Sequence, residues 1–185
     1  MEKIQVHDKV FQHYISKEDI ENRINELAAT INRDYSNKNP LFLGVLNGAF
    51  MFAADLFRKI TIPAEICFIK LASYKGTKST GEIHRAIGLD ADIKGRDVII
   101  LEDIVDTGKT LSEFLPELAL QQPGAVKIAA LLYKPDATKF PVTIDYQGFV
   151  IPDKFVVGYG LDYDGYGRNL NGIYVEESQN WSRRS

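Results

Sequence analysis

The chain has 185 residues, of which 45% are hydrophobic and 25% charged, and its net charge is −3. This length corresponds to one domain with a substantial core, and the charge balance does not point to a nucleic-acid backbone or an anionic membrane as a partner. The single cysteine, Cys67, cannot form an internal disulfide, and its apolar neighbours indicate a buried residue in a reducing compartment. The N-terminus lacks the apolar core of a signal peptide, and no apolar run is long enough to span a bilayer, so we expect a cytoplasmic protein.

The first half of the chain alternates between helical and strand patterns. Ser16, with Asp19 three residues later, resembles a capping box and predicts a helix over about 17–33. A short apolar strand over 41–46 and a tight Asn47-Gly48 turn then lead into a buried helix over 49–58. A further strand is predicted over 64–73.

The second half begins with a segment, 74–82, that has no apolar periodicity and is typical of a surface loop. A short strand over 86–89 follows. The β-branched run 98–101 indicates a strand buried on both faces, as in a parallel sheet. After it we expect a helix that ends at Pro123-Gly124 and a strand over 126–133. The remainder consists of short strands and turns, so the sequence predicts a βαβ core over about 41–134 with a cap made of both chain ends.

The strand over 98–101 ends at two adjacent carboxylates, Glu102 and Asp103, and a polar loop follows before the helix. The loop consists of Asp106, Thr107, Gly108, Lys109 and Thr110. Its hydroxyls, its glycine and the free amides of a helix start suit a phosphate monoester. Carboxylates beside a phosphate make sense if the ligand also carries hydroxyls, a divalent metal or a centre that becomes cationic. A sugar phosphate meets these conditions.

Two other interpretations of this loop are possible. A Walker A motif requires a glycine five residues before Gly108, but Asp103 occupies that position, so this interpretation fails. The other is an acidic turn without function. The buried strand before the acids and the Thr-Gly-Lys-Thr loop after them argue against it.

The stretch resembles the phosphoribosyl-diphosphate (PRPP) signature of the type I phosphoribosyltransferases. Residues 152–163, followed by Arg168, and residues 129–134 most resemble the hypoxanthine/guanine phosphoribosyltransferases, and the likeness extends from about 41 to 177. It implies an α/β fold with a mainly parallel central sheet flanked by helices and a small hood subdomain. The whole chain, 1–185, would be one domain, with a hood formed by the N-terminal segment and about 135–185.

The resemblance assigns roles at the acidic end of the strand. Glu102 and Asp103 would hold the ribose hydroxyls, directly or through Mg²⁺, and the loop 106–110 would bind the phosphate. Asp106 would be the catalytic general base, within reach of the purine nitrogen N7. The alternative for Asp106 is a helix N-cap, and the two roles are compatible.

A second set of residues would bind pyrophosphate. The family uses backbone amides at the position of Leu46, Asn47 and Gly48, commonly across a non-proline cis peptide bond, and Arg168 would assist. Asn47 departs from the Lys-Gly-Gly often found there and brings no charge. Without the resemblance, Asn47-Gly48 reads as an ordinary turn.

The purine site would come from Lys134 and the segment near residue 155. Lys134 would donate to the exocyclic oxygen of the base, whereas the alternative is a lysine that extends from the strand end into solvent. The resemblance gives the purine site as Lys134, Phe155, Val156 and Asp162, the metal ligands as Glu102, Asp103 and Asp162, and the working end of a closing lid as Ser73 and Tyr74.

These assignments imply a Mg²⁺-dependent salvage enzyme that joins hypoxanthine, and guanine, to PRPP and releases pyrophosphate. It would form a homodimer or homotetramer and bind neither nucleic acid nor membrane. One rival is a transferase for xanthine, adenine or a pyrimidine; Lys134, Phe155 and Asp162 favour a 6-oxopurine. The other is an RNA-binding regulator of the same fold, for which the charge of −3 gives little support.

Overall fold

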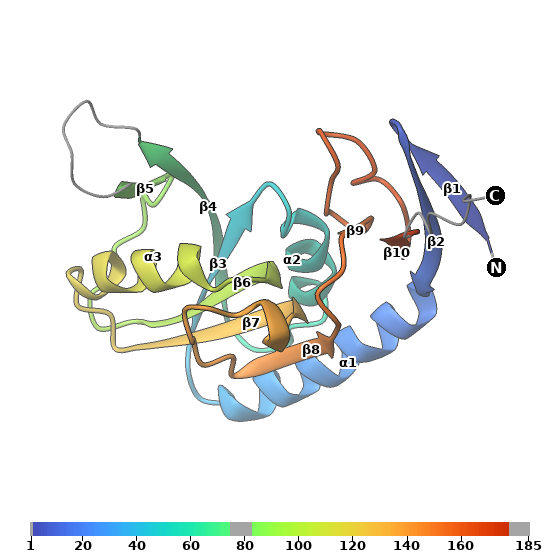
Figure 1. The fold of residues 1–185 in the computed structure, drawn as a ribbon. Coiled ribbons are helices and arrows are strands. Elements are labelled where there is room, and N and C mark those ends of the chain that lie inside the picture. The colour runs from blue at the N-terminus through green and yellow to red at the C-terminus, as the bar shows by residue number, and fades with distance from the viewer. Residues whose placement is uncertain (1, 75–82, 178–185) are drawn as a thin grey trace, which may run out of the picture.

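A six-stranded sheet forms the centre of the molecule (Figure 1). The computed structural model describes residues 2–74 and 83–177. The strands of this sheet are β3 (Leu41–Leu46), β4 (Glu65–Tyr74), β5 (Ile83–Ile87), β6 (Asp97–Val105), β7 (Ala125–Tyr133) and β8 (Tyr146–Val150). They lie in the order β5-β4-β3-β6-β7-β8, and all neighbours are parallel except β5, which pairs antiparallel with β4.

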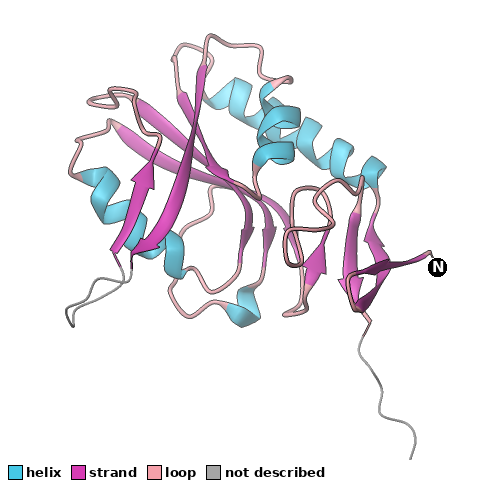
Figure 2. Ribbon diagram, turned by 90° about the horizontal axis from the view of Figure 1, so that it is seen from above, coloured by secondary structure: helices cyan, strands magenta, loops and turns pink. Residues whose placement is uncertain are grey.

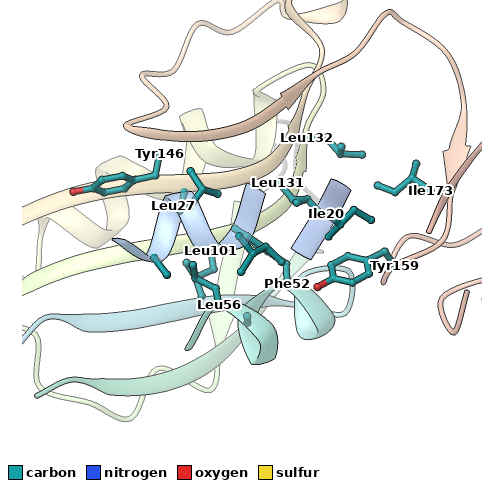
Figure 3. Packing of buried hydrophobic residues seen from close by; sticks show 14 of the residues in the cluster. Ile20, Leu27, Phe52, Leu56, Leu101, Leu131, Leu132, Tyr146, Tyr159 and Ile173 are labelled. Carbon is teal, nitrogen blue, oxygen red and sulfur yellow. The ribbon is translucent and has the colours of Figure 1, made fainter. Parts of the chain in front are cut away.

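Helices cover both faces of the sheet (Figure 2). On one face, α1 (Lys17–Asp34) and α2 (Phe50–Phe57) share a core with Ile99 and Leu101 of β6, as Figure 3 shows for Leu101. On the other, α3 (Lys109–Ala119) packs with Val98 and Ile100. β6 is therefore buried on both faces, as its apolar run predicted. Within the two described ranges, no helix is long and apolar enough to cross a membrane.

A separate antiparallel sheet forms the hood. Its strands are β1 (Lys3–Val6), β2 (Lys9–Ile15), β9 (Val156–Val157) and β10 (Ile173–Glu176), in the order β1-β2-β10-β9. Two strands come from each end of the chain, and Figure 1 shows this sheet beside the core, reached by α1. The predicted fold class, a mainly parallel sheet with flanking helices and a small hood, is confirmed.

The start of α1 follows its predicted capping chemistry. The Ser16 hydroxyl accepts a hydrogen bond from the backbone N–H of Asp19 at 3.0 Å, which satisfies an amide that the first helical turn leaves free. The helix then buries one apolar stripe at helical spacing, formed by Ile20, Ile24, Leu27, Ala28 and Ile31.

Three predicted boundaries are wrong. β6 does not stop at Glu102 but runs to Val105, because β7 continues to pair with it as far as Tyr133. The strand predicted over 86–89 is β5, which lies at Ile83–Ile87 because it pairs with the end of β4. The core does not end at 134, because β8 adds a parallel strand beside β7.

The sheet opens between β3 and β6 at their carboxyl ends. β3 pairs with β6 only as far as Gly44 and Leu101, whereas β6 stays paired with β7 to its end. The helix after β3 lies on one face and the helix after β6 on the other. This is the topological switch point at which open α/β sheets bind ligands.

Candidate active site

A cleft of about 330 Å³ lies at this opening. Its walls are the end of β3, Leu71 of β4, the tip of β6 and the start of α3. The predicted residues Glu102, Asp103 and Leu46 line it, and so does the whole predicted phosphate loop, 106–110. Another cavity, of about 470 Å³, lies between α1 and α2 and includes Asp55 and Tyr159 but none of the predicted site residues.

The phosphate loop is held against the chain that follows β7. The Thr107 carbonyl accepts hydrogen bonds from the backbone N–H groups of Lys139 and Phe140, both at 3.0 Å. Gly108 has φ +78° and lies so close to the Phe140 carbonyl that a Cβ atom would collide with it. Only glycine fits both conditions. Gly108 is also the N-cap residue of α3, so the N-cap alternative for Asp106 is wrong.

The two acids at the tip of β6 differ in exposure. Glu102 is 7% exposed, and burial, with the neighbouring Asp103 carboxylate, holds its pKa well above the usual value. Burial also raises the pKa of Asp103 to about 6, although the Ile104 N–H, which donates to Oδ1 at 2.9 Å, and Arg168 oppose that rise. A buried carboxylate, Glu102, beside a half-buried one, Asp103, favours a ligand that brings positive charge or hydroxyl donors.

The Asn47-Gly48 turn follows β3 and lies against the second of these acids, Asp103. The peptide bond between Leu46 and Asn47 is cis, as the resemblance led us to expect. A Cβ atom on Gly48 would collide with Oδ2 of Asp103, so the turn lies directly against that carboxylate. Gly160 of the hood also lies against this turn, because a Cβ atom on Gly160 would collide with the Gly48 carbonyl oxygen. The turn thus touches both the core and the hood.

Asp106 contacts the lysine that ends β7. Nζ of Lys134 lies 3.1 Å from Oδ2 of Asp106 and 3.8 Å from Oδ1 of Asp153. Lys134 is only 5% exposed, so the alternative in which it extends into solvent is wrong. A buried ammonium needs carboxylate or carbonyl partners, and Asp106 is the nearer one here.

The remaining charged pair lies in the hood. Arg168 contacts Asp162 at 2.8 Å and donates to the Gly160 carbonyl at 2.7 Å. The second Asp162 oxygen accepts from the Gly165 N–H at 2.7 Å. Asp162 is engaged by these partners, and its charge also raises the pKa of Asp103; its role as a third metal ligand stays a prediction. Across residues 2–74 and 83–177, no three acidic, histidine or cysteine side chains form a group that could hold an ion.

Comparisons with known proteins place the chain in a family. The model of the phosphoribosyl transferase domain matches residues 14–164. A hypoxanthine-guanine phosphoribosyltransferase of Lactococcus lactis is 44% identical over 84% of this chain and 85% of its own length, and one of Aquifex aeolicus is 40% identical over 94% and 98%. The chain belongs to the hypoxanthine-guanine phosphoribosyltransferase family.

A solved structure of this phosphoribosyltransferase family agrees in fold. The hypoxanthine phosphoribosyltransferase of Staphylococcus aureus superimposes with a TM-score of 0.84 at 38% identity, covering 93% of this chain and 94% of its own. The protein is thus a phosphoribosyltransferase, as its sequence motifs implied.

The other predicted base-binding residues of this phosphoribosyltransferase, apart from Lys134 at the end of β7, lie on the hood. Phe155 is 40% exposed. Val156 belongs to β9, the edge strand, and pairs with Val175. Because the Glu176 N–H donates to the Phe155 carbonyl at 2.8 Å, Val156 occupies a non-hydrogen-bonded position. Its own N–H and C=O therefore point away from β10, toward the open edge of the hood sheet.

Some contacts of this phosphoribosyltransferase site carry no signal in the sequence. The Thr138 hydroxyl, beyond the short 3₁₀ turn η1 (Pro135–Ala137), bridges the carbonyls of Asp106 and Lys134 at 3.1 and 2.9 Å. No local pattern marks it. Residues 75–82 of the predicted lid lie outside the described residues. Of Ser73 and Tyr74, only the backbone is described; it forms the end of β4 and pairs with β5.

Proposed function

We propose that the protein transfers the 5-phosphoribosyl group from PRPP to hypoxanthine and guanine and releases pyrophosphate. One observation carries the choice of base: a buried lysine, Lys134, lies beside Asp106 at the edge of the acidic cleft. The family relationship supports the transfer itself.

Lys134 is suited to a 6-oxopurine. Its ammonium can donate to the oxygen at position six, whereas adenine has an amino donor there. A donor facing the lysine would leave a buried charge without compensation, which costs about 1–3 kcal/mol or more. The outward-pointing backbone groups of Val156 can pair with the edge of the base, and the exposed ring of Phe155 can stack on it.

The cleft is suited to the sugar phosphate. Thr107, Thr110 and the backbone amides at the start of α3 can bind the 5-phosphate. Glu102 and Asp103 can accept hydrogen bonds from the ribose hydroxyls. They also suit a ring carbon that gains positive charge while pyrophosphate leaves.

The same acids fit Mg²⁺ bound together with its substrate. Mg²⁺ usually takes one or two carboxylates and substrate phosphates and retains several waters. Burial raises the pKa values of Glu102 and Asp103, and a neighbouring carboxylate adds to each rise: Asp103 at Glu102 and Asp162 at Asp103. A divalent cation relieves this cost. Bound there, Mg²⁺ would neutralise charge on the pyrophosphate. The amides of the Asn47-Gly48 turn and Arg168 would hold that leaving group from the other side.

Asp106 is placed for proton transfer. Its carboxylate is 45% exposed toward the cleft and is held by Lys134, so both groups can face one bound purine. Asp106 can share the proton at N7 while the new C–N bond forms, and Lys134 polarises the oxygen at position six.

A panel of free bases tests this function. Hypoxanthine, guanine, xanthine and adenine are each incubated with PRPP, Mg²⁺ and the protein, and nucleotide formation is followed by absorbance. We expect conversion of hypoxanthine and guanine and very slow conversion of adenine. Turnover of adenine alone, or of none of the four bases, would refute the proposal.

Assembly and location remain predictions. The family resemblance leads us to expect a homodimer or homotetramer in the cytoplasm. Light scattering coupled to size-exclusion chromatography measures the mass directly, and a monomer at micromolar concentration would contradict the first expectation.

A further inference from the structure

The ring of Phe155 is held by the N-terminal hairpin of the hood. Its centroid lies 5.7 Å from that of Tyr163 at an interplanar angle of 79°, and 6.1 Å from that of Phe11 in β2. The contact with Phe11 is tilted, whereas that with Tyr163 is edge-to-face and favours one ring orientation. The hairpin is far from the phosphate loop in sequence and fold, and its contribution to any site is not evident from the sequence.

Lys9, at the start of β2, lies over this aromatic group. Its Nζ is 5.2 Å from the centroid of Phe155 and 4.9 Å from that of Tyr163. Glu176 of β10 holds the ammonium at 2.9 Å. A cation within about 6 Å of a ring centroid is attracted to the π face. Lys9 therefore has two rings and one carboxylate as partners.

The adjacent residue fixes the second ring. The Tyr163 hydroxyl donates to Oδ1 of Asp8 at 2.8 Å. Asp8 and Lys9 thus hold Tyr163 at its hydroxyl and at its ring, and Tyr163 in turn meets Phe155. Phe155 is 40% exposed despite these contacts, so part of its ring is accessible to a planar ligand.

We propose that Lys9 is a positioning residue for base binding: it sets the orientation of Phe155, directly and through Tyr163, before the purine arrives. This inference rests on the proposed function, in which Phe155 stacks on the base. Ordering an aromatic side chain before binding removes part of the cost of ordering it during binding. The effect belongs to the base and not to PRPP, because none of the groups proposed to bind PRPP, on β6, α3, the Asn47-Gly48 turn and Arg168, is among the contacts of Lys9 described above.

The test compares Lys9→Met, Lys9→Arg and Lys3→Met. Lys3 is a matched control, because it lies in the same hairpin and pairs with Glu177, the residue after the partner of Lys9. Lys3 contacts this carboxylate, whereas Lys9 also lies over two rings. We expect Lys9→Met to raise KM for hypoxanthine by about 3- to 10-fold, with KM for PRPP and kcat within about 2-fold. Lys9→Arg keeps the cation and should restore most of the base affinity, and Lys3→Met should resemble wild type.

Three results would overturn the inference: an unchanged KM for hypoxanthine in Lys9→Met, equal effects in Lys9→Met and Lys3→Met, or a parallel rise in both KM values. Tyr163→Phe provides a second variant if Lys9→Met does not fold, since it keeps the ring and loses only the bond to Asp8; it should raise KM for hypoxanthine by a smaller factor. Phe155→Ala separates the two proposals. If it leaves KM for hypoxanthine unchanged, the proposed base site is itself wrong; if it raises KM while Lys9→Met does not, only the positioning role fails.

Discussion

At the scale of the residue, Asp106 and Lys134 gain their proposed roles from each other. The ammonium of Lys134 is buried and needs a negative partner, and the Asp106 carboxylate 3.1 Å away supplies it. The same contact places a proton acceptor and a proton donor at one edge of the cleft. A 6-oxopurine offers a ring proton and an oxygen on one side, so the pair can serve both.

The first prediction concerns the basicity of Asp106. Asp106→Asn preserves size but removes the proton acceptor, so kcat should fall by roughly 10²–10⁴-fold. The dissociation constant for PRPP should change little. Asp153→Asn is the matched control, because Asp153 is the other carboxylate near Lys134 but does not line the cleft. If steady-state kinetics of Asp106→Asn stay within a few-fold of wild type, Asp106 is not the base.

The second prediction follows from the raised pKa of Asp103. The pKa of Asp103 is about 6 in the folded protein, whereas an aspartate in an unfolded chain has a pKa of 3.8. The native state therefore binds a proton more tightly than the unfolded state. The stabilisation that this tighter proton binding gives the folded protein is fully present below pH 3.8 and is lost as the pH rises through about 6. The ionised carboxylate therefore destabilises the free protein at neutral pH.

Asp103→Asn removes that penalty. Without Mg²⁺ or PRPP, the variant should be more stable than wild type at pH 7.5 by about 1–3 kcal/mol, because each pKa unit corresponds to about 1.4 kcal/mol. The gain should shrink toward pH 4. Thermal unfolding of both proteins from pH 4 to 8 measures it. A constant difference across that range, or a less stable variant at pH 7.5, would show that the carboxylate is not destabilised by burial.

At the scale of the element, the opening between β3 and β6 creates the site. Pairing between these strands ends at Gly44 and Leu101, so the residues that follow can diverge to face a ligand. The turn after β3 then comes so close to β6 that a Cβ atom at position 48 would collide with the Asp103 carboxylate. The opening and the close contact together set the distance between the acids and the proposed pyrophosphate amides.

Gly48→Ala tests this contact. The added methyl collides with Oδ2 of Asp103, so the variant should lose about 1–3 kcal/mol of stability, the usual cost of overpacking. In an Asp103→Ala background the collision partner is gone, and the same substitution should cost much less. Denaturant unfolding of wild type, Gly48→Ala, Asp103→Ala and the double variant gives the cost of Gly48→Ala in both backgrounds. Equal costs in the two backgrounds would mean that the strain arises elsewhere.

Elements with a complete local pattern could be predicted from the sequence, and those defined by their neighbours could not. The capping residues and apolar stripe of α1 and the apolar run of β6 specify their structures without tertiary information. The extension of β6 past Glu102 depends on pairing with β7, and the position of β5 depends on β4. β8 and the hairpin of β1 and β2 have no pattern strong enough to stand out.

The candidate site shows the same division. The phosphate loop was evident because its chemistry lies within a few consecutive residues. The contact of Lys134 with Asp106 joins residues 28 positions apart, and spacing alone does not reveal it. The bridge from Thr138 and the ring contacts of Lys9 are likewise products of the folded chain.

At the scale of the whole molecule, the site is shared between the core and the hood. The core contributes the acids and the phosphate loop, and the hood contributes Phe155, Val156 and the pair formed by Asp162 and Arg168. Gly160 against the Gly48 carbonyl, and the Tyr159 hydroxyl that donates to Asp55 of α2 at 2.5 Å, join the two parts. Substrate bound between them would contact both.

Metal dependence is the prediction at this scale. In the proposed reaction, pyrophosphate would leave past Glu102, Asp103 and Asp162, and without Mg²⁺ this arrangement would be repulsive. Chelation should therefore abolish turnover and PRPP binding together, and added Mg²⁺ should restore both. Calorimetric titration of PRPP with and without EDTA, alongside an activity assay, provides the readout. Full activity in excess EDTA would exclude a role for the metal.

The central claim is that Lys134 selects the base. The most direct measurement is kcat/KM for hypoxanthine and adenine in wild type and in Lys134→Met. A site built to hydrogen-bond one substrate group can reject an analogue that lacks it by about 10⁴-fold or more, so wild type should favour hypoxanthine by that order. Lys134→Met should lose most of this preference while it binds PRPP nearly as well as wild type. Comparable use of adenine and hypoxanthine by wild type, or an unchanged preference in the variant, would contradict the account.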